Sequence, residues 1–278
     1  MRHKVMRVGL VLVMTALLTG CFSTSWLIGL NEDGSGTIDM EYRLDKSVLD
    51  MMDSFGGEGK KKTTTSEDLI KQQDLEKLAG QLGEGVRFVS AEPLPEENGR
   101  LGFTAQFEFD DISKVGLDPM EGAPEQDSQN VEADEQSVPP YTFQFTQGSP
   151  AALVIKVAQE NGEATEGSSA EEQSESGDES GGQDQEMMTA MMKPYLRNMS
   201  FRVQVKIDGT ISKTDAAYRD GSTITLMDMD MGKIIDNETL FKKVMNSDQA
   251  FKDKEMLKQL EKEGIRIEPK EEVTVQFR

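Results

Sequence analysis

The side chains that carry most enzyme chemistry are scarce in this chain of 278 residues. It contains one histidine, His3, and one cysteine, Cys21. A Ser-His-Asp triad, a histidine-ligated zinc site and a cysteine–histidine nucleophile all need a histidine inside the folded protein. His3 belongs to a predicted export signal, which is removed on maturation. The sequence therefore excludes these three classes of site.

The residues around Cys21 indicate a different chemistry, lipidation. A positively charged start precedes an apolar run, Val8–Leu18. The run has the length of a signal-peptide core and is shorter than the roughly 20 residues that span a bilayer. It leads into Leu18-Thr19-Gly20-Cys21, which resembles the lipobox of bacterial lipoproteins.

The lipobox resemblance implies signal cleavage between Gly20 and Cys21, so that residues 1–20 are the signal peptide. It also implies a diacylglycerol on the Cys21 thiol and a further acyl chain on its new amino group, and no other cofactor is expected. Two or three acyl chains anchor a protein stably where one does not. We therefore expect a lipid-anchored protein on the periplasmic or extracellular side of the cell envelope. Phe22 after the cysteine favours the outer membrane, by the sorting pattern of enteric-type bacteria.

A polar segment after the lipobox resembles the front of an EF-hand calcium loop. The oxygen-bearing residues at its ligand positions are Asn31, Asp33, Ser35 and Asp39. The twelfth position, where a bidentate glutamate belongs, is Tyr42. The flanking residues also alternate like strands and not like helices. The sequence therefore favours a polar hairpin turn and no metal site, with calcium binding as the alternative.

No other constellation selects a catalytic site. The chain has 51 Asp and Glu residues, so carboxylate pairs suited to glycoside hydrolysis are too numerous to indicate one. Ser113-Lys114 and Ser212-Lys213 have no supporting motif, and no glycine loop has P-loop spacing. Methionines at 187, 188, 191 and 192 are interpreted as apolar filler on a helix face and not as Cu(I) ligands. The protein is predicted not to be an enzyme.

The charge of the chain excludes one class of partner. Its formal net charge is −21 at pH 7, and the predicted signal removes several of its basic residues. A strongly acidic protein repels the phosphates of nucleic acids. No nucleic-acid partner is expected.

Alternating apolar and polar residues predict half-buried strands. The alternation is present at residues 38–44, 101–109, 141–145, 153–157, 201–207 and 273–277. One wet face on each strand favours antiparallel pairing. Asp33-Gly34, Asn98-Gly99 and Asp220-Gly221 are turn dipeptides of the hairpin type, and the second is predicted to close 86–91 against 100–109.

Apolar residues at helical spacing predict helices over 66–82 and 237–263, and a short one over 48–55. Ser66 is the expected N-cap of the first and Gly83 its end, and Ser247 is the expected start of the last helical stretch, which ends at Gly264. The predicted fold class is α+β, a twisted antiparallel β-sheet with the helices on one face, plus a long disordered acidic insertion.

Three polar segments are predicted to be disordered loops, near 56–65, 117–139 and 159–186. The last has ten carboxylates and no lysine or arginine, and such a composition cannot bury enough apolar surface to offset its chain entropy. Because apolar strands flank it on both sides, we predict one domain over 21–278 with a long surface loop. A linker between two domains is the alternative.

Two stretches of the chain resemble a known family. A lipobox followed by a strand and the turn Asp33–Thr37, and then Met199–Ile207 with the hairpin around Asp220–Leu226, are similar to the LppM-type lipoprotein domain of mycobacteria. The resemblance implies an α+β cell-envelope domain, a group for which lipid binding has been proposed. The chain departs from the family in lacking a C-terminal membrane helix, in its acidic insertion and in its helical end.

These observations predict a membrane-anchored cell-envelope lipoprotein that acts as a non-catalytic binding module for a lipid or a neighbouring envelope protein. The alternatives are a structural or assembly scaffold without a small ligand and, less favoured, a hydrolase. The sequence does not identify the ligand-binding residues. A deep apolar cavity would favour the lipid, and a flat exposed apolar patch would favour the scaffold.

Overall fold

The computed structural model describes residues 22–49, 64–119, 140–157, 193, 196–245, 247, 250–251 and 253–278. Several predictions fall outside these residues and are not tested by them. They are the signal peptide, its cleavage site at Gly20 and Cys21, the acidic segment 159–186, most of the other two predicted loops, the methionines at 187–192 and most of the short helix over 48–55.

The larger of two β-sheets contains eight of the described strands. In spatial order they are β10 (Arg219–Asp220), β11 (Thr223–Asp230), β8 (Ser200–Ile207), β1 (Phe22–Leu30), β2 (Gly36–Asp45), β4 (Arg100–Phe109) and β3 (Arg87–Glu97), with β12 (Arg266–Ile267) paired to β11. Strands β1 and β8 run parallel, and the other described pairs in this sheet are antiparallel. The predicted antiparallel character is confirmed.

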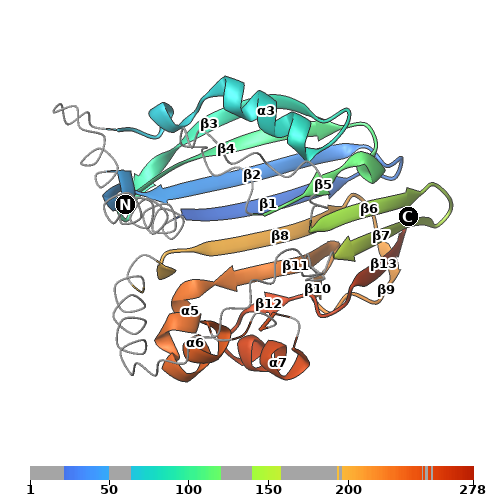
Figure 1. Ribbon diagram of the computed structural model, residues 1–278. Helices are drawn as coiled ribbons and strands as arrows, with labels where there is room; N and C mark the ends of the chain where they lie inside the picture. The colour runs from blue at the N-terminus through green and yellow to red at the C-terminus, as the bar shows by residue number, and fades with distance from the viewer. Residues whose placement is uncertain are drawn as a thin grey trace, which may run out of the picture.

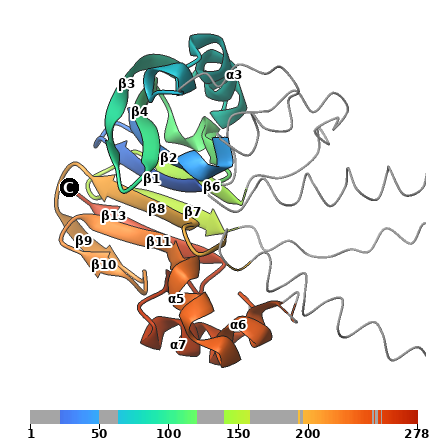
Figure 2. The same ribbon diagram turned by 90° about the vertical axis from the view of Figure 1, so that its left-hand side faces the viewer.

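A second, five-stranded sheet packs on the first. Its strands, in spatial order, are β5 (Gly116–Leu117), β6 (Tyr141–Thr146), β7 (Ala151–Val157), β13 (Glu272–Phe277) and β9 (Ile211–Thr214). Figures 1 and 2 place β6 and β7 over β1 and β8, on the same side of the large sheet as the first long helix. Helices alone were expected to cover this face, because the alternation of a strand does not tell which sheet it joins.

The apolar face of each strand is buried between the layers, as the alternation predicts. Trp26, in the centre of β1, is 0% exposed. The ring of Phe22 meets Phe201 edge to face with centroids 5.6 Å apart, and Phe145 and Phe277 pair within the small sheet at 6.4 Å. Buried residues from both sheets form one contiguous cluster. The α+β fold thus has a single described core.

The helices lie near the two opposite edges of the large sheet, by β3 and by β11 (Figure 1). They are α3 (Gln72–Leu82) beside β3, and α5 (Met231–Asp236), α6 (Glu238–Met245) and α7 (Lys254–Lys262) near β11 and β12, with short 3-10 turns η1 (Glu67–Leu69) and η2 (Ile112–Lys114). Leu75, Leu78 and Leu82 make the buried stripe of α3. The predicted helices over 66–82 and 237–263 therefore exist in shorter pieces.

Of two predicted helix starts, Ser66 is confirmed in position and Ser247 is wrong. Ser66 stands at the N-cap position of η1, but its hydroxyl donates to the Leu94 carbonyl at 2.6 Å and accepts from the Gly102 N–H at 3.2 Å, so the side chain joins β3 to β4 and makes no capping bond. The last helix begins after Asp253, whose carboxylate accepts from the Met256 N–H at 2.7 Å, and not at Ser247. A cap depends on which polar partner the fold brings near, which local sequence does not specify.

The predicted helix ends and turns are confirmed. Gly83 follows α3 with a φ of 141°, and Gly264 follows α7 with a φ of 77°. Asn98 and Gly99 both have positive φ in the turn between β3 and β4, as a tight hairpin turn requires. The 31–35 turn closes β1 against β2.

Candidate functional site on the outer face of the large sheet

The large sheet has a second face, which points away from the core and which we call the outer face. Alternate side chains of β1, β2, β4 and β8 point to it, and they are half-buried or exposed. Most of them are hydroxyl, amide or charged groups. A polar sheet face on a protein with one core is a surface that can contact a ligand.

Strand register sorts the outer face into rows that run across the strands. The first row consists of Glu92, Thr104, Glu41, Ser25, Arg202 and Asp228, from β3 to β11. The second consists of Ser90, Gln106, Asp39, Leu27, Gln204 and Thr225. Neighbours within a row are about 4.8 Å apart, the distance between paired strands. Six strands from both halves of the chain thus present their polar groups side by side.

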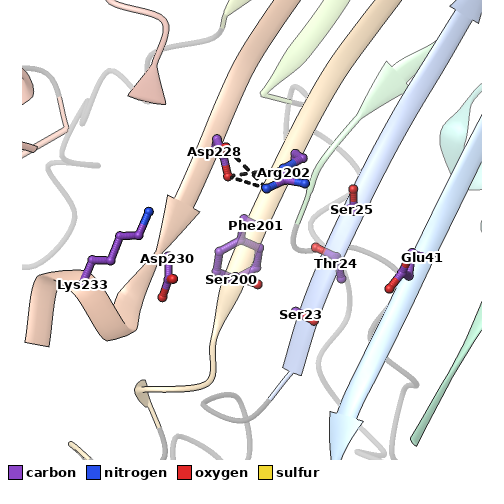
Figure 3. A pocket seen from close by; sticks show the side chains of 10 residues that line it. All are labelled: Ser23, Thr24, Ser25, Glu41, Ser200, Phe201, Arg202, Asp228, Asp230 and Lys233. Carbon is purple, nitrogen blue, oxygen red and sulfur yellow. Dashed lines mark hydrogen bonds and ion pairs between the residues drawn. The ribbon is translucent and has the colours of Figure 1, made fainter. Parts of the chain in front are cut away.

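Two hollows lie along these rows and share Ser25 and Glu41. The larger, of about 510 Å³, extends from β1 over β2 and β4 to β3. The smaller, of about 280 Å³, lies between β2, β1, β8 and β11 and reaches the start of α5 (Figure 3). The carboxylates that line them are Asp39, Glu41, Glu92, Asp228 and Asp230, and the lining cations are Arg202 and Lys233. The surface is therefore polar and mostly acidic.

Neighbouring side chains fix two of the three carboxylates of the larger hollow, Glu41 and Asp39. The Arg43 Nε donates to Glu41 Oε1 at 2.7 Å. The Arg43 side chain is only 18% exposed and lies over Gly102, where an added Cβ would come within 2.8 Å of its Cγ. The Gln106 amide donates to Asp39 Oδ1 at 2.8 Å. Each of these two carboxylates is thus held through one oxygen.

The smaller hollow contains opposite charges that meet each other. Arg202 Nη2 lies 3.2 Å from Asp228 Oδ1, across the β8–β11 pair (Figure 3). Asp230 accepts from the Gly232 N–H at 2.9 Å and so caps α5, the helix that carries Lys233. Most of the charge in this hollow is therefore compensated within the protein.

The calcium-like segment forms the turn that the sequence favours. Ser35 donates to Asp33 Oδ1 through both its backbone N–H and its hydroxyl, and Asn31 donates to Ser35 Oγ. The hydrogen bonds from Ser35 lower the pKa of Asp33. Asp39 lies four residues further along β2, about 13 Å away. The structure brings three of the four residues together and places Asp39 on the outer face. Within the described ranges, no group of three or more His, Cys, Asp or Glu side chains could hold a metal ion.

A separate carboxylate, Glu268, is buried far from solvent. Its side chain is 4% exposed, its Oε2 accepts from the Ala217 N–H at 2.8 Å, and its Oε1 makes no hydrogen bond. Its own N–H donates to the Leu226 carbonyl at 2.8 Å. Burial raises the pKa of Glu268. The residue joins the segment after β9 of the small sheet to β11 of the large one.

The sequence predicts which residues of each strand point to the outer face, but not which strands lie side by side there. Alternation separates the wet residues Asp39 and Glu41 from the buried ones, and does the same for Thr104 and Gln106. The strand order that sets these residues beside β8 and β11 comes from pairings between distant segments. The rows were therefore not predictable from local pattern.

Comparison with known proteins adds little to this geometry. No protein-family model and no curated protein matches the chain. Among solved structures, the folded domain of the Mycobacterium tuberculosis LppM protein matches with 8% identity and a TM-score of 0.31, over 77% of this chain and 84% of that one. A likeness this distant says nothing of a ligand. None of the described helices is long and apolar enough to cross a bilayer.

Proposed function

We propose that the protein is a lipid-anchored module of the cell envelope that binds a neighbouring envelope protein through the outer face, without catalysis. One observation carries the proposal. Strand β1 begins at Phe22, the residue after the expected lipidation site Cys21, and its outward side chains Ser23 and Ser25 line the hollows. A single strand thus connects the expected anchor to the candidate site.

Strand β1 fixes the distance between the expected lipid anchor and the hollows on the outer face. An extended chain advances about 3.3 Å per residue, so Ser25 lies about 13 Å from the lipidated residue. Phe22 is itself buried, which leaves no flexible tether between lipid and domain. A partner that reaches the smaller hollow is therefore at the membrane surface, on the periplasmic or extracellular side and, by the sorting pattern, at the outer membrane.

The chemistry of the outer face favours a protein partner over a lipid ligand. Acyl chains need enclosed apolar walls. The smaller hollow is lined by polar residues apart from Phe201, and the larger one mixes polar residues with Leu27, Met40 and Ala105 on an open sheet face. Aromatic rings that could have lined a lipid cavity pack against each other in the core, such as Phe88 on Phe107. A structural or assembly scaffold, the alternative, could use the same face and likewise needs no small ligand.

The test is site-specific photo-crosslinking in cells, on the full chain. A photoreactive amino acid at Ser25 should give a discrete adduct with one envelope protein, and the same group at Glu271, on the small sheet, should give none. Cys21→Ser should release the protein from membranes and remove the adduct. Membrane association that survives Cys21→Ser after correct cleavage would overturn the anchor. If mass spectrometry of the purified protein found a stoichiometric bound lipid, the ligand would be a lipid and the proposal of a protein partner would be contradicted.

A further inference from the structure

We propose that the partner docks on the outer face through an extended segment that carries lysine or arginine at alternate positions. The segment lies along β2, over Asp39 and Glu41, with Glu92 at its side. This inference rests on the proposed function and names the chemistry of the partner. Charge and spacing on the outer face carry it.

The two hollows differ in how their charge is compensated. In the smaller one Arg202 pairs with Asp228, and a second cation, Lys233, whose Nζ lies 3.5 Å from the Gly264 carbonyl oxygen, is also part of the lining (Figure 3). The larger one is lined by Asp39, Glu41 and Glu92 and by no cationic side chain. Arg43, which is not part of this lining, pairs with Glu41, whereas Asp39 and Glu92 make no ion pair with a described residue. Carboxylates without a cationic partner on a sheet face attract a partner of opposite charge and repel others. The complementary partner is therefore cationic.

The spacing of the carboxylates selects an extended partner. Asp39 and Glu41 are alternate residues of one strand, about 7 Å apart. Alternate side chains on an extended segment repeat at the same distance. Two cations at positions i and i+2 can therefore meet both carboxylates at once. Glu92 lies two strands from Glu41 in the first row, about 10 Å away, within reach of a longer side chain at the edge.

The carboxylates of Glu41 and Asp39 are held in place before a partner arrives. Arg43 occupies Oε1 of Glu41, and Gln106 occupies Oδ1 of Asp39. The Arg43 side chain is packed on the sheet with 18% exposure, and its hydrogen bond to Glu41 uses Oε1 and not Oε2. Orientation in the free protein reduces the ordering cost of binding.

The experiment uses the lipidated full chain in nanodiscs of phosphatidylcholine, whose headgroups carry no net charge. The probes are two fluorescent synthetic peptides of identical composition, one with lysine and threonine in alternation and one with the lysines in a block. Anisotropy should show the alternating peptide binding at least tenfold more tightly, with affinity falling as salt is raised from 50 to 300 mM, the usual behaviour of screened charges.

Matched variants separate the site from the general acidity of the protein. Asp39→Asn, Glu41→Gln and Glu92→Gln together should weaken the alternating peptide at least tenfold. Glu67→Gln, Glu271→Gln and Glu272→Gln remove the same charge from exposed positions off the outer face and should change binding less than twofold. Circular dichroism checks that both triple variants are folded.

Three outcomes overturn this inference: equal binding of the two peptides, equal loss in the two triple variants, or no binding of either peptide. If the Ser25 crosslinker nevertheless captures an envelope protein, the proposed function stands and only the cationic, extended character of its partner is lost. If the alternating peptide binds as expected but no crosslink forms in cells, the preference of the outer face for a cationic extended segment is supported. The proposed binding of an envelope protein is then contradicted.

Discussion

At the scale of single residues, Glu268 is unusual among the described side chains because it is a buried carboxylate with an unsatisfied oxygen. A carboxylate with one hydrogen bond and one buried bare oxygen is costly in its ionised form. Lys270 and Asp215, which pair with each other nearby, face it with opposite charges, and burial outweighs them in raising its pKa. The charge state of Glu268 therefore affects the link between the two sheets.

We predict that Glu268→Gln stabilises the protein, and increasingly so as pH rises. The raised folded-state pKa means that the stabilising contribution of protonated Glu268 is complete below the unfolded value, near 4.5, and is lost as pH rises through the folded value. Glutamine keeps the bond from Ala217 and does not ionise. Urea denaturation from pH 4 to pH 8 should show the gain over wild type growing with pH. Glu271→Gln, an exposed control, should show no such trend, and a gain independent of pH would contradict the prediction.

At the scale of elements, two glycines differ in what a methyl group would meet. On Gly36, at the start of β2, a Cβ would stand 1.9 Å from the Gly29 carbonyl oxygen and 2.6 Å from the Phe109 ring. On Gly80, inside α3, it would meet no atom within 4 Å. The first glycine permits the close approach of β1 and β2, and the second only weakens a helix.

Alanine at these two positions should therefore have opposite effects. Gly36→Ala forces strands apart and should lower the free energy of unfolding by about 1–3 kcal/mol, the usual cost of overpacking. Gly80→Ala should raise it by roughly 0.5–1 kcal/mol, since glycine loses more chain entropy in a helix. Chemical denaturation of both variants measures this. If Gly36→Ala left the free energy of unfolding unchanged, β1 and β2 would not approach each other at Gly36 as closely as the structure shows.

What could be predicted from sequence also divides by element. Alternation identified β2, β4, β6, β7, β8 and β13, because a strand with one solvent-facing side alternates polar and apolar residues along its own sequence. It did not separate the two sheets or pair β1 with β8, since those contacts join residues far apart in sequence. Ser66 makes no capping bond and Ser247 begins no helix, because their partners depend on tertiary structure. The outer face was recoverable strand by strand, and its rows were not.

At the scale of the whole molecule, one core spans both sheets, and the prediction of a single domain can be tested on it. Trp26 is the only tryptophan in the chain and reports from the centre of β1. If 21–278 is one domain, Trp26 fluorescence and far-ultraviolet circular dichroism should give coincident unfolding curves in urea. Two separated transitions would instead support two domains joined by the acidic segment.

The parallel pairing of β1 with β8 also has a consequence for the order of assembly. In a chain that emerges from its N-terminal end, β1, β2, β3 and β4 come first and can form the β1–β2 and β3–β4 hairpins, which then join through β2 and β4. Strand β8 and the last strand of the small sheet, β13, emerge only much later. Until then the apolar side of these four strands, which includes Trp26, lacks the part of its cover that β8 and β13 complete. We therefore expect the unfinished sheet to be prone to aggregation until β8 is added.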